Sequence, residues 1–346
     1  MKEQYDNLDG LRAISCMAVI AMHIAANATY ELGTVGSNIV GSWTHLVALF
    51  LMISGFGMFC GYYERFKSGS IDLNNFYTKR YKKIIPFFIT LILIDIVMDR
   101  SLGHIIEGFT EATLVFGLLP NNQPDVIGVS WTLGVIFLFY MLFPFVVYMC
   151  WTKRRAWITF GISIILSLFC TFYYFTDKFV IEGFAPRHNF LYCAPWFIAG
   201  GLIYINRRKI SNNVNRIKWL WLASCICLSI VWCITPHDGK WISLLKNLVV
   251  FIPWLMYAIS VDSRVLNNKV MNYLGSISFE MYLAQMVVFR LLEKIHCLYL
   301  FGHSWISFFI AWILVIVGLI VLIEVWKRIL ILLQNMISKH EGKLGG

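Results

Sequence analysis

The chain has 346 residues, of which 59% are hydrophobic and only 14% are charged. Soluble globular domains carry about 25% charged residues, so this composition excludes an ordinary soluble domain and indicates an integral membrane protein. The net charge of +10 lies on basic residues between apolar runs, which indicates membrane topology and not a nucleic-acid partner. The nine cysteines are scattered and form no Cys-x-x-Cys pair, so we interpret them as packing residues and expect no bound metal.

Apolar stretches long enough to cross a bilayer recur along the whole chain. We expect an all-α, polytopic fold with about ten transmembrane helices, forming one membrane domain over residues 8–330, and a short cytoplasmic tail over 331–346. The segment 104–119 is apolar but short, so both a re-entrant and an interfacial position stay open for it. The ten expected spans are 8–29, 43–63, 84–98, 130–150, 156–176, 190–206, 217–234, 242–261, 271–292 and 304–330.

Basic residues gather on one side of this map, in the cluster 79–83 and the runs 153–155 and 207–209. The other side holds only a few, including Arg100 and Lys178. By the positive-inside rule, we expect a multi-pass protein of the cell membrane with both termini in the cytoplasm. The first apolar run has no basic stretch before it and no cleavage motif, so we expect a retained helix and not a signal peptide.

Arg12 and His23 lie eleven residues apart in the first apolar run. On a helix this spacing returns to within roughly 20° of the same face and separates the two side chains by about 16 Å along the axis. One helix face therefore carries a cation near one membrane surface and an imidazole deep inside. Each residue alone has an ordinary explanation, a snorkelling anchor for Arg12 and a hydrogen-bonded core residue for His23. Together they suggest an anionic substrate that enters at Arg12 and proton-transfer chemistry at His23.

The basic cluster Lys79-Arg80-Tyr81-Lys82-Lys83 precedes the third expected span. Its ordinary role is to set topology, and its functional interpretation is a phosphate-binding patch for a nucleotide-bearing substrate. No Gly-x-Gly-x-x-Gly sequence or P-loop is present, so a soluble-type nucleotide fold is not expected.

Three other segments place polar groups inside apolar runs. Ser54 lies among small residues that usually serve close helix packing. Trp131 begins the fourth span, as part of an interfacial aromatic belt or as a wall for a substrate. Glu280 and Gln285 fall in the middle of the ninth span, where an acid favours a functional role.

In this order, five segments resemble the membrane-bound acyltransferase-3 family over essentially the whole chain. Leu8 to Arg12, followed by His23, resembles the family's Arg/Lys with ten residues before a His, and Phe50 to Phe56 resembles its Phe-rich segment ending in Ser-Gly-Phe. Arg80 to Lys83 resembles its Arg-x-x-Arg pair. Ser130 to Leu133 resembles its Trp-Ser-Leu segment, and Ser278 to Leu283 resembles its Ser-Tyr-Ser-x-Tyr-Leu segment.

Two positions depart from the family pattern. After Trp131 the family often has glutamates, whereas this chain has Ile136, Phe137 and Leu138. After the late Tyr-Leu pair the family often has a histidine, whereas this chain has Gln285, which cannot shuttle a proton near neutral pH. A mechanism that needs either group therefore lacks it at these positions.

The resemblance implies transfer of an acyl group, usually acetyl, from cytoplasmic acyl-CoA to a hydroxyl of an envelope glycan or glycolipid. It implies that acyl-CoA is a co-substrate and that no cofactor is permanently bound. His23 would be the general base or the acyl carrier, Arg12, Arg80 and Lys83 would bind CoA, and Ser54, Trp131, Glu280 and Gln285 would line the substrate passage. Two alternatives stay open: a transporter or exporter of a small solute, and a non-catalytic relative that binds a ligand.

Overall fold

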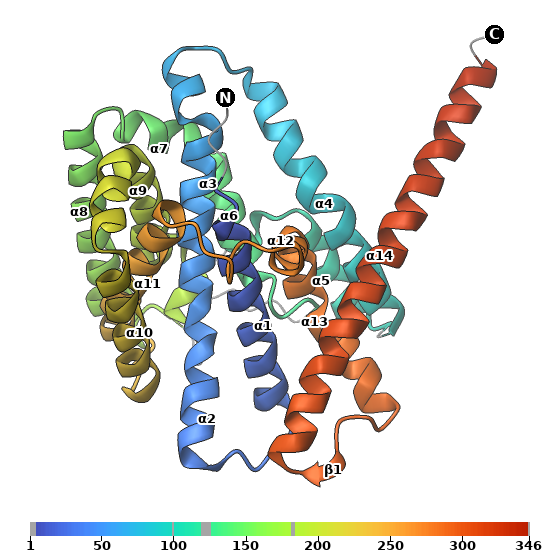
Figure 1. Ribbon diagram of the computed structural model, residues 1–346. Helices are drawn as coiled ribbons and strands as arrows, with labels where there is room; N and C mark the ends of the chain where they lie inside the picture. The colour runs from blue at the N-terminus through green and yellow to red at the C-terminus, as the bar shows by residue number, and fades with distance from the viewer. Residues whose placement is uncertain (1–4, 99, 119–125, 181–183, 345–346) are drawn as a thin grey trace.

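The computed structural model describes residues 5–98, 100–118, 126–180 and 184–344, with side chains up to Met336. In this part of the chain nearly all residues are helical (Figure 1). The long helices are α1 Asn7–Asn27, α3 Val47–Lys67, α4 Leu73–Met98, α8 Lys153–Phe169, α9 Phe190–Arg216, α10 Lys218–Ile234, α11 Trp241–Ser260, α13 Ser278–Lys294 and α14 Trp305–Leu344. The shorter elements are α2 Gly33–Ser42, η1 Trp43–Leu46, α5 Leu102–Ala112, η2 Val115–Leu118, α6 Trp131–Met141, α7 Phe143–Met149, η3 Cys170–Tyr174, η4 Pro186–His188, α12 Lys269–Ser276 and the strand β1 Leu300–His303.

The all-helical class is confirmed, whereas the expected number of about ten spans is not. By length and composition, five helical segments within the described part of the chain could cross a membrane. Two bent pairs raise the number to seven, namely α6 with α7, which meet at 59°, and α9 with α10, which meet at 98°. The five segments are Asn7–Asn27, Gly33–Lys67, Lys153–Tyr174, Trp241–Ser260 and Trp305–Met336.

The basic cluster of α4 and a break between α12 and α13 explain part of this difference. The expected span 84–98 is the second part of α4, whose first part carries the basic cluster. The expected span 271–292 is interrupted at Ile277, between α12 and α13. Glu280 consequently lies in the first turn of α13 and not in the middle of a span.

The short apolar segment 104–119 forms α5 and η2. With 11 residues, α5 is about 16 Å long, which is too short to cross a bilayer. Its first turn is capped by Ser101, whose side chain accepts a hydrogen bond from the backbone N–H of His104. The helix folds back against α4, where the His104 imidazole contacts Asp95.

Glycines set the close helix packing that surrounds the site. A Cβ at Gly55 of α3 would lie 2.1 Å from the carbonyl oxygen of Phe197, and one at Gly200 of α9 would lie 2.0 Å from that of Met52. These two positions therefore bring the backbones of α3 and α9 into direct contact. The small residues beside Ser54 thus serve helix packing.

Helix α1 lies in the middle of the bundle (Figure 1). It packs against α3, α11, α12, α13 and α14. The connection between α3 and α4 lies at one end of the molecule, and β1 and the connection after α1 lie at the opposite end (Figure 1). Polar residues on α1 are consequently surrounded by other helices.

Candidate functional site

A cavity of about 470 Å³, here called the basic cavity, opens beside the first half of α1. Three cations line it, Arg12 from α1 and Arg80 and Lys83 from α4. The structure therefore brings together the three residues that the sequence resemblance assigned to CoA binding. Its other walls come from α3, α6, α12 and α13, with Asp9, Phe50, Ser54, Gly57, Met58, Ile84, Thr132, Ile136, Tyr140, Gly275, Ser276, Ser278, Phe279 and Tyr282.

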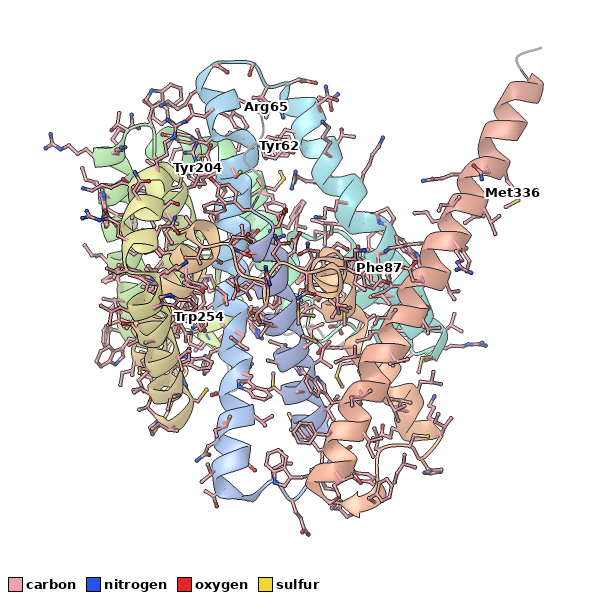
Figure 2. All side chains as sticks on the ribbon, viewed as in Figure 1. Tyr62, Arg65, Phe87, Tyr204, Trp254 and Met336 are labelled. Atoms are coloured by element: carbon pink, nitrogen blue, oxygen red, sulfur yellow. The ribbon has the colours of Figure 1, made fainter. Side chains whose placement is uncertain are left out.

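A second cavity of about 550 Å³, here called the entrance cavity, adjoins the basic cavity. Asp9, Arg12, Gly57 and Arg80 line both. The entrance cavity also contains Arg65 of α3, which lies near the end of the molecule that carries the α3–α4 connection (Figure 2). Cations therefore follow one path from this end toward the middle of the bundle, as binding of an extended anion requires.

The Arg12 guanidinium is held by its own helix. Its Nη1 donates to Asp9 Oδ1 at 2.7 Å, three residues earlier on α1. The side chains of Arg12 and Asp9 are 33% and 36% exposed, so the pair faces the cavity and is not sealed in the core. Gly57 of α3 lies beside it, since a Cβ there would be in ordinary van der Waals contact with Arg12 Nη2 at 3.6 Å. Asp9 thus orients Arg12 and leaves other guanidinium N–H groups for a ligand.

Aromatic side chains position Arg80. Its guanidinium carbon lies 4.9 Å from the centre of the Tyr62 ring and 5.6 Å from that of Tyr140, and its Nη2 donates to the Tyr62 hydroxyl. Tyr140 in turn is 3.1 Å from the Ser54 hydroxyl. Ser54 thus belongs to the wall of the basic cavity and reaches Arg80 through Tyr140.

Two hydroxyl groups close the deep end of the basic cavity. Thr132 of α6 and Tyr282 of α13 lie on opposite helices, and their hydroxyl oxygens are 2.7 Å apart. Thr132 is 4% exposed and Tyr282 7%. Sequence reasoning missed this pair, although both residues lie in the segments that carry the family resemblance.

Beyond this pair lies a third cavity of about 270 Å³, here called the His23 cavity. Four parts of the chain that line the basic cavity also line the His23 cavity, with other residues: α1, α4, α13 and the segment at the start of α6. On α13, Tyr282 lines the basic cavity and Leu283 the His23 cavity. Before and in α6, Val129 and Thr132 are related in the same way. The two cavities are therefore stacked along α1, with the hydroxyl pair at their boundary.

A charged cluster forms one wall of the His23 cavity. Asp95 Oδ2 lies 2.6 Å from His104 Nε2, and Asp95 Oδ1 accepts from Arg290 Nη1 at 3.2 Å. Asp95 is 3% exposed although it comes near the end of α4. No local sequence pattern indicates this cluster, because Arg290, the partner of Asp95, is 195 positions away.

A buried carboxylic acid holds another wall of the same cavity. Glu111 of α5 is 1% exposed and accepts hydrogen bonds from the Ile127 backbone N–H at 3.3 Å and the Ser130 hydroxyl at 3.0 Å. Burial raises the pKa of the Glu111 carboxyl to about 7, although these hydrogen bonds oppose the rise. Because α5 has only 11 residues, it is too short to cross a bilayer, and this carboxyl belongs to a non-spanning segment.

Three of the residues expected along the substrate passage lie elsewhere. The Trp131 ring stacks on His188 of η4, with ring centres 4.7 Å apart, and neither ring lines the basic cavity or the His23 cavity. Gln285 is buried, and its Nε2 donates to the Tyr282 carbonyl oxygen at 2.8 Å. Glu280 has a buried Oε2 that makes no hydrogen bond among the described residues. Neither Glu280 nor Gln285 lines the two cavities.

Among the described residues, no group of three or more His, Cys, Asp or Glu side chains is placed to hold a metal ion.

Comparison with known proteins gives a family match over nearly the whole length. Residues 5–325 match a family model described as an acyltransferase domain of the acyltransferase-3 type. An uncharacterized protein of Haemophilus influenzae is 22% identical over 247 residues, which are 64% of this chain and 98% of that protein. Acyltransferase MdmB of Streptomyces mycarofaciens is 31% identical over 153 residues, which are 40% of this chain and 38% of that protein. No solved structure matches.

Proposed function

Because this chain belongs to the acyltransferase-3 family, we propose that it is a membrane O-acyltransferase that uses acyl-CoA. The acyl group, most simply acetyl, is transferred from cytoplasmic acyl-CoA to a hydroxyl of a cell-envelope glycan or glycolipid. The arrangement of two cavities along α1 supports this proposal more than any other observation. One cavity carries Arg12, Arg80 and Lys83, the other carries His23, and the Thr132–Tyr282 pair lies between them.

The basic cavity and the entrance cavity suit the CoA part of the substrate. CoA carries phosphate groups at one end and a thioester at the other, so it requires cations followed by a narrower passage. Arg12 and Arg80 offer guanidinium groups that match phosphate geometry, and Lys83 adds a point charge. With the phosphates at these residues, the pantetheine arm points along α1 toward Thr132 and Tyr282. On this proposal, the end of α14 and the start of α1 lie on the cytoplasmic side.

From its position in the His23 cavity, His23 can act either as a general base or as a nucleophile. As a general base, it takes the proton of the acceptor hydroxyl while the hydroxyl oxygen attacks the thioester carbon, the C–S bond breaks, and the CoA thiolate receives the proton. As a nucleophile, an imidazole nitrogen first forms a C–N bond to the acyl carbon and releases the CoA thiolate. The acceptor oxygen then forms the ester and breaks the C–N bond, and its proton passes to CoA. In both routes the Thr132–Tyr282 pair must separate for the acyl group to reach His23.

Acyl transfer by the purified protein tests the proposal. Full-length protein in liposomes is supplied with radiolabelled acetyl-CoA on the side of the α3–α4 connection and with envelope extract on the other. We expect label in an ester of the extract, and no label with acetyl-CoA added only to the other side. Solute flux without a covalent product would support the transporter alternative, and CoA binding without either would support a non-catalytic relative.

A further inference from the structure

The His23 cavity has a polar wall that the transfer chemistry does not use. Arg290 of α13 and Asp95 of α4 both line it, together with His23 and Asn27 of α1. The volume of about 270 Å³ lies below the range of about 300–1,000 Å³ typical of drug-sized ligands. It therefore fits one small part of an acceptor, such as a single sugar unit, and not a whole glycan.

The hydrogen bonds of this wall leave mainly N–H groups for a ligand. Both carboxylate oxygens of Asp95 are engaged, one by His104 at 2.6 Å and one by Arg290 at 3.2 Å. Arg290 uses one nitrogen for this contact, and a guanidinium has five N–H groups. Its side chain is 48% exposed, so the remaining N–H groups are accessible, whereas the carboxylate is almost fully buried at 5%.

A second cation adds to the positive potential near this cavity. Arg187 of η4 contributes to the electrostatic environment of the His23 imidazole, although it does not itself line the His23 cavity. Its Nε is buried and has no hydrogen-bond partner among the described residues. Its guanidinium carbon lies 5.5 Å from the centre of the Trp131 ring, which holds it in place. The surroundings of His23 therefore favour an anion over a neutral or cationic group.

We infer that the His23 cavity binds the acceptor through an anionic group, a phosphate or a carboxylate, that lies beside the hydroxyl to be acylated. Arg290 contacts the anion, because a guanidinium matches both oxyanions with paired N–H groups. Asp95 positions Arg290 through one carboxylate oxygen, and its other carboxylate oxygen contacts His104. The inference rests on the proposed function in one respect, that the hydroxyl faces His23. The anion site itself stands on the cavity and its charges.

Binding of three matched probes tests the anion site without requiring catalysis. Glucose 6-phosphate, glucuronic acid and glucose are titrated into the full-length protein in detergent, and heat is measured by calorimetry. We expect both anionic probes to bind at least about tenfold more tightly than glucose, since a charge-assisted hydrogen bond contributes about 1.5–3 kcal/mol. The ratio between the two anionic probes shows whether a phosphate or a carboxylate is preferred.

Three variants locate the binding. Arg290→Gln should weaken both anionic probes by about tenfold or more and leave glucose unchanged. Arg100→Gln is the matched control, because Arg100 is an exposed arginine near the end of α4 that does not line the cavity. Lys83→Ala reports on anion binding in the basic cavity, which the proposed function assigns to the CoA phosphates. Loss of binding in Lys83→Ala with retention in Arg290→Gln would place the anion in the basic cavity and overturn the inference, as would the absence of saturable binding of both anionic probes.

The experiments distinguish an incorrect anion site from an incorrect assignment of the protein as an acyltransferase. His23→Gln should retain Arg290-dependent anion binding whether or not the protein is an acyltransferase. Acyl transfer to a neutral acceptor that is unaffected by Arg290→Gln would retain the proposed function and overturn the anion site. Arg290-dependent binding without any acyl transfer would support the site and contradict the proposed function.

Discussion

The hydroxyl oxygens of Thr132 and Tyr282 are 2.7 Å apart, at the point where the basic cavity ends and the His23 cavity begins. Because both residues are buried, removal of one hydroxyl leaves the other without a partner, at a cost of about 1–3 kcal/mol. Tyr282→Phe and Thr132→Val should therefore each lower the unfolding temperature in detergent. The double variant should lose less than the sum of the two single losses.

The same variants test the pair as a boundary between the cavities. If the pair separates acyl-CoA from His23 and water, Tyr282→Phe should increase acyl-CoA hydrolysis in the absence of an acceptor, measured by thiol release. Additive stability losses together with unchanged hydrolysis would show that the two hydroxyl groups act independently.

Lys83 and its neighbour Lys82 provide a matched test of CoA binding. Lys83 lines the basic cavity and Lys82 does not, although both are exposed and belong to one basic cluster. Lys83→Ala should weaken acyl-CoA binding by about 1.5–3 kcal/mol, with a strong salt dependence, and Lys82→Ala should have little effect. Equal effects in both variants would mean that the cluster acts only through its overall charge.

The sequence predicted the all-helical membrane class and named three cations that the structure brings to one cavity, whereas the roles of these cations and of His23 stay predictions. The membrane class follows from composition. The placement of residues on one helix follows from their spacing in the sequence, because residues at helical spacing lie on the same face. Arg12 lines the basic cavity and His23 the next cavity along the same helix, as their eleven-residue spacing indicated.

The charged wall of the His23 cavity could not be predicted in this way. Asp95 and Arg290 meet only because α4 and α13 pack together, and no local pattern records that contact. The position of Glu280 was wrong for a different reason. Hydropathy continues across Ile277, whereas the backbone breaks there, so an acid expected in mid-span lies in a first turn.

The pH dependence of stability tests the placement of Glu111. Because burial raises its pKa from 4.5 to about 7, the folded protein holds this proton more tightly than the unfolded chain does. Its contribution to stability is full below about pH 4.5, falls as the pH rises to about 7, and is level above that. Glu111→Gln, which cannot ionise, should reduce the difference in unfolding temperature between about pH 5 and about pH 8. An unchanged difference would contradict the buried position of this carboxyl.

Alanine substitutions at Gly200 and Gly161 distinguish the effect of close helix packing from the general effect of replacing a glycine within a helix. A Cβ at Gly200 would lie 2.0 Å from the Met52 carbonyl oxygen, whereas one at Gly161 of α8 would meet no atom within 4 Å. Gly200→Ala should lower stability by about 1–3 kcal/mol or more, and Gly161→Ala should raise it by about 0.5–1 kcal/mol. Unfolding followed by intrinsic tryptophan fluorescence measures both changes. A tolerated Gly200→Ala would mean that α3 and α9 do not pack as described.

Acyl transfer by His23→Gln is the most direct measurement of the proposed mechanism. Glutamine retains much of the hydrogen bonding of histidine, but it cannot accept a proton or carry the acyl group. We predict that acylation of the envelope acceptor falls by about 10²–10⁴-fold or more, while protein level and acyl-CoA binding stay as in the wild type. Near-wild-type acyl transfer by His23→Gln would show that His23 is a structural residue, and it would contradict the mechanism proposed for the two cavities.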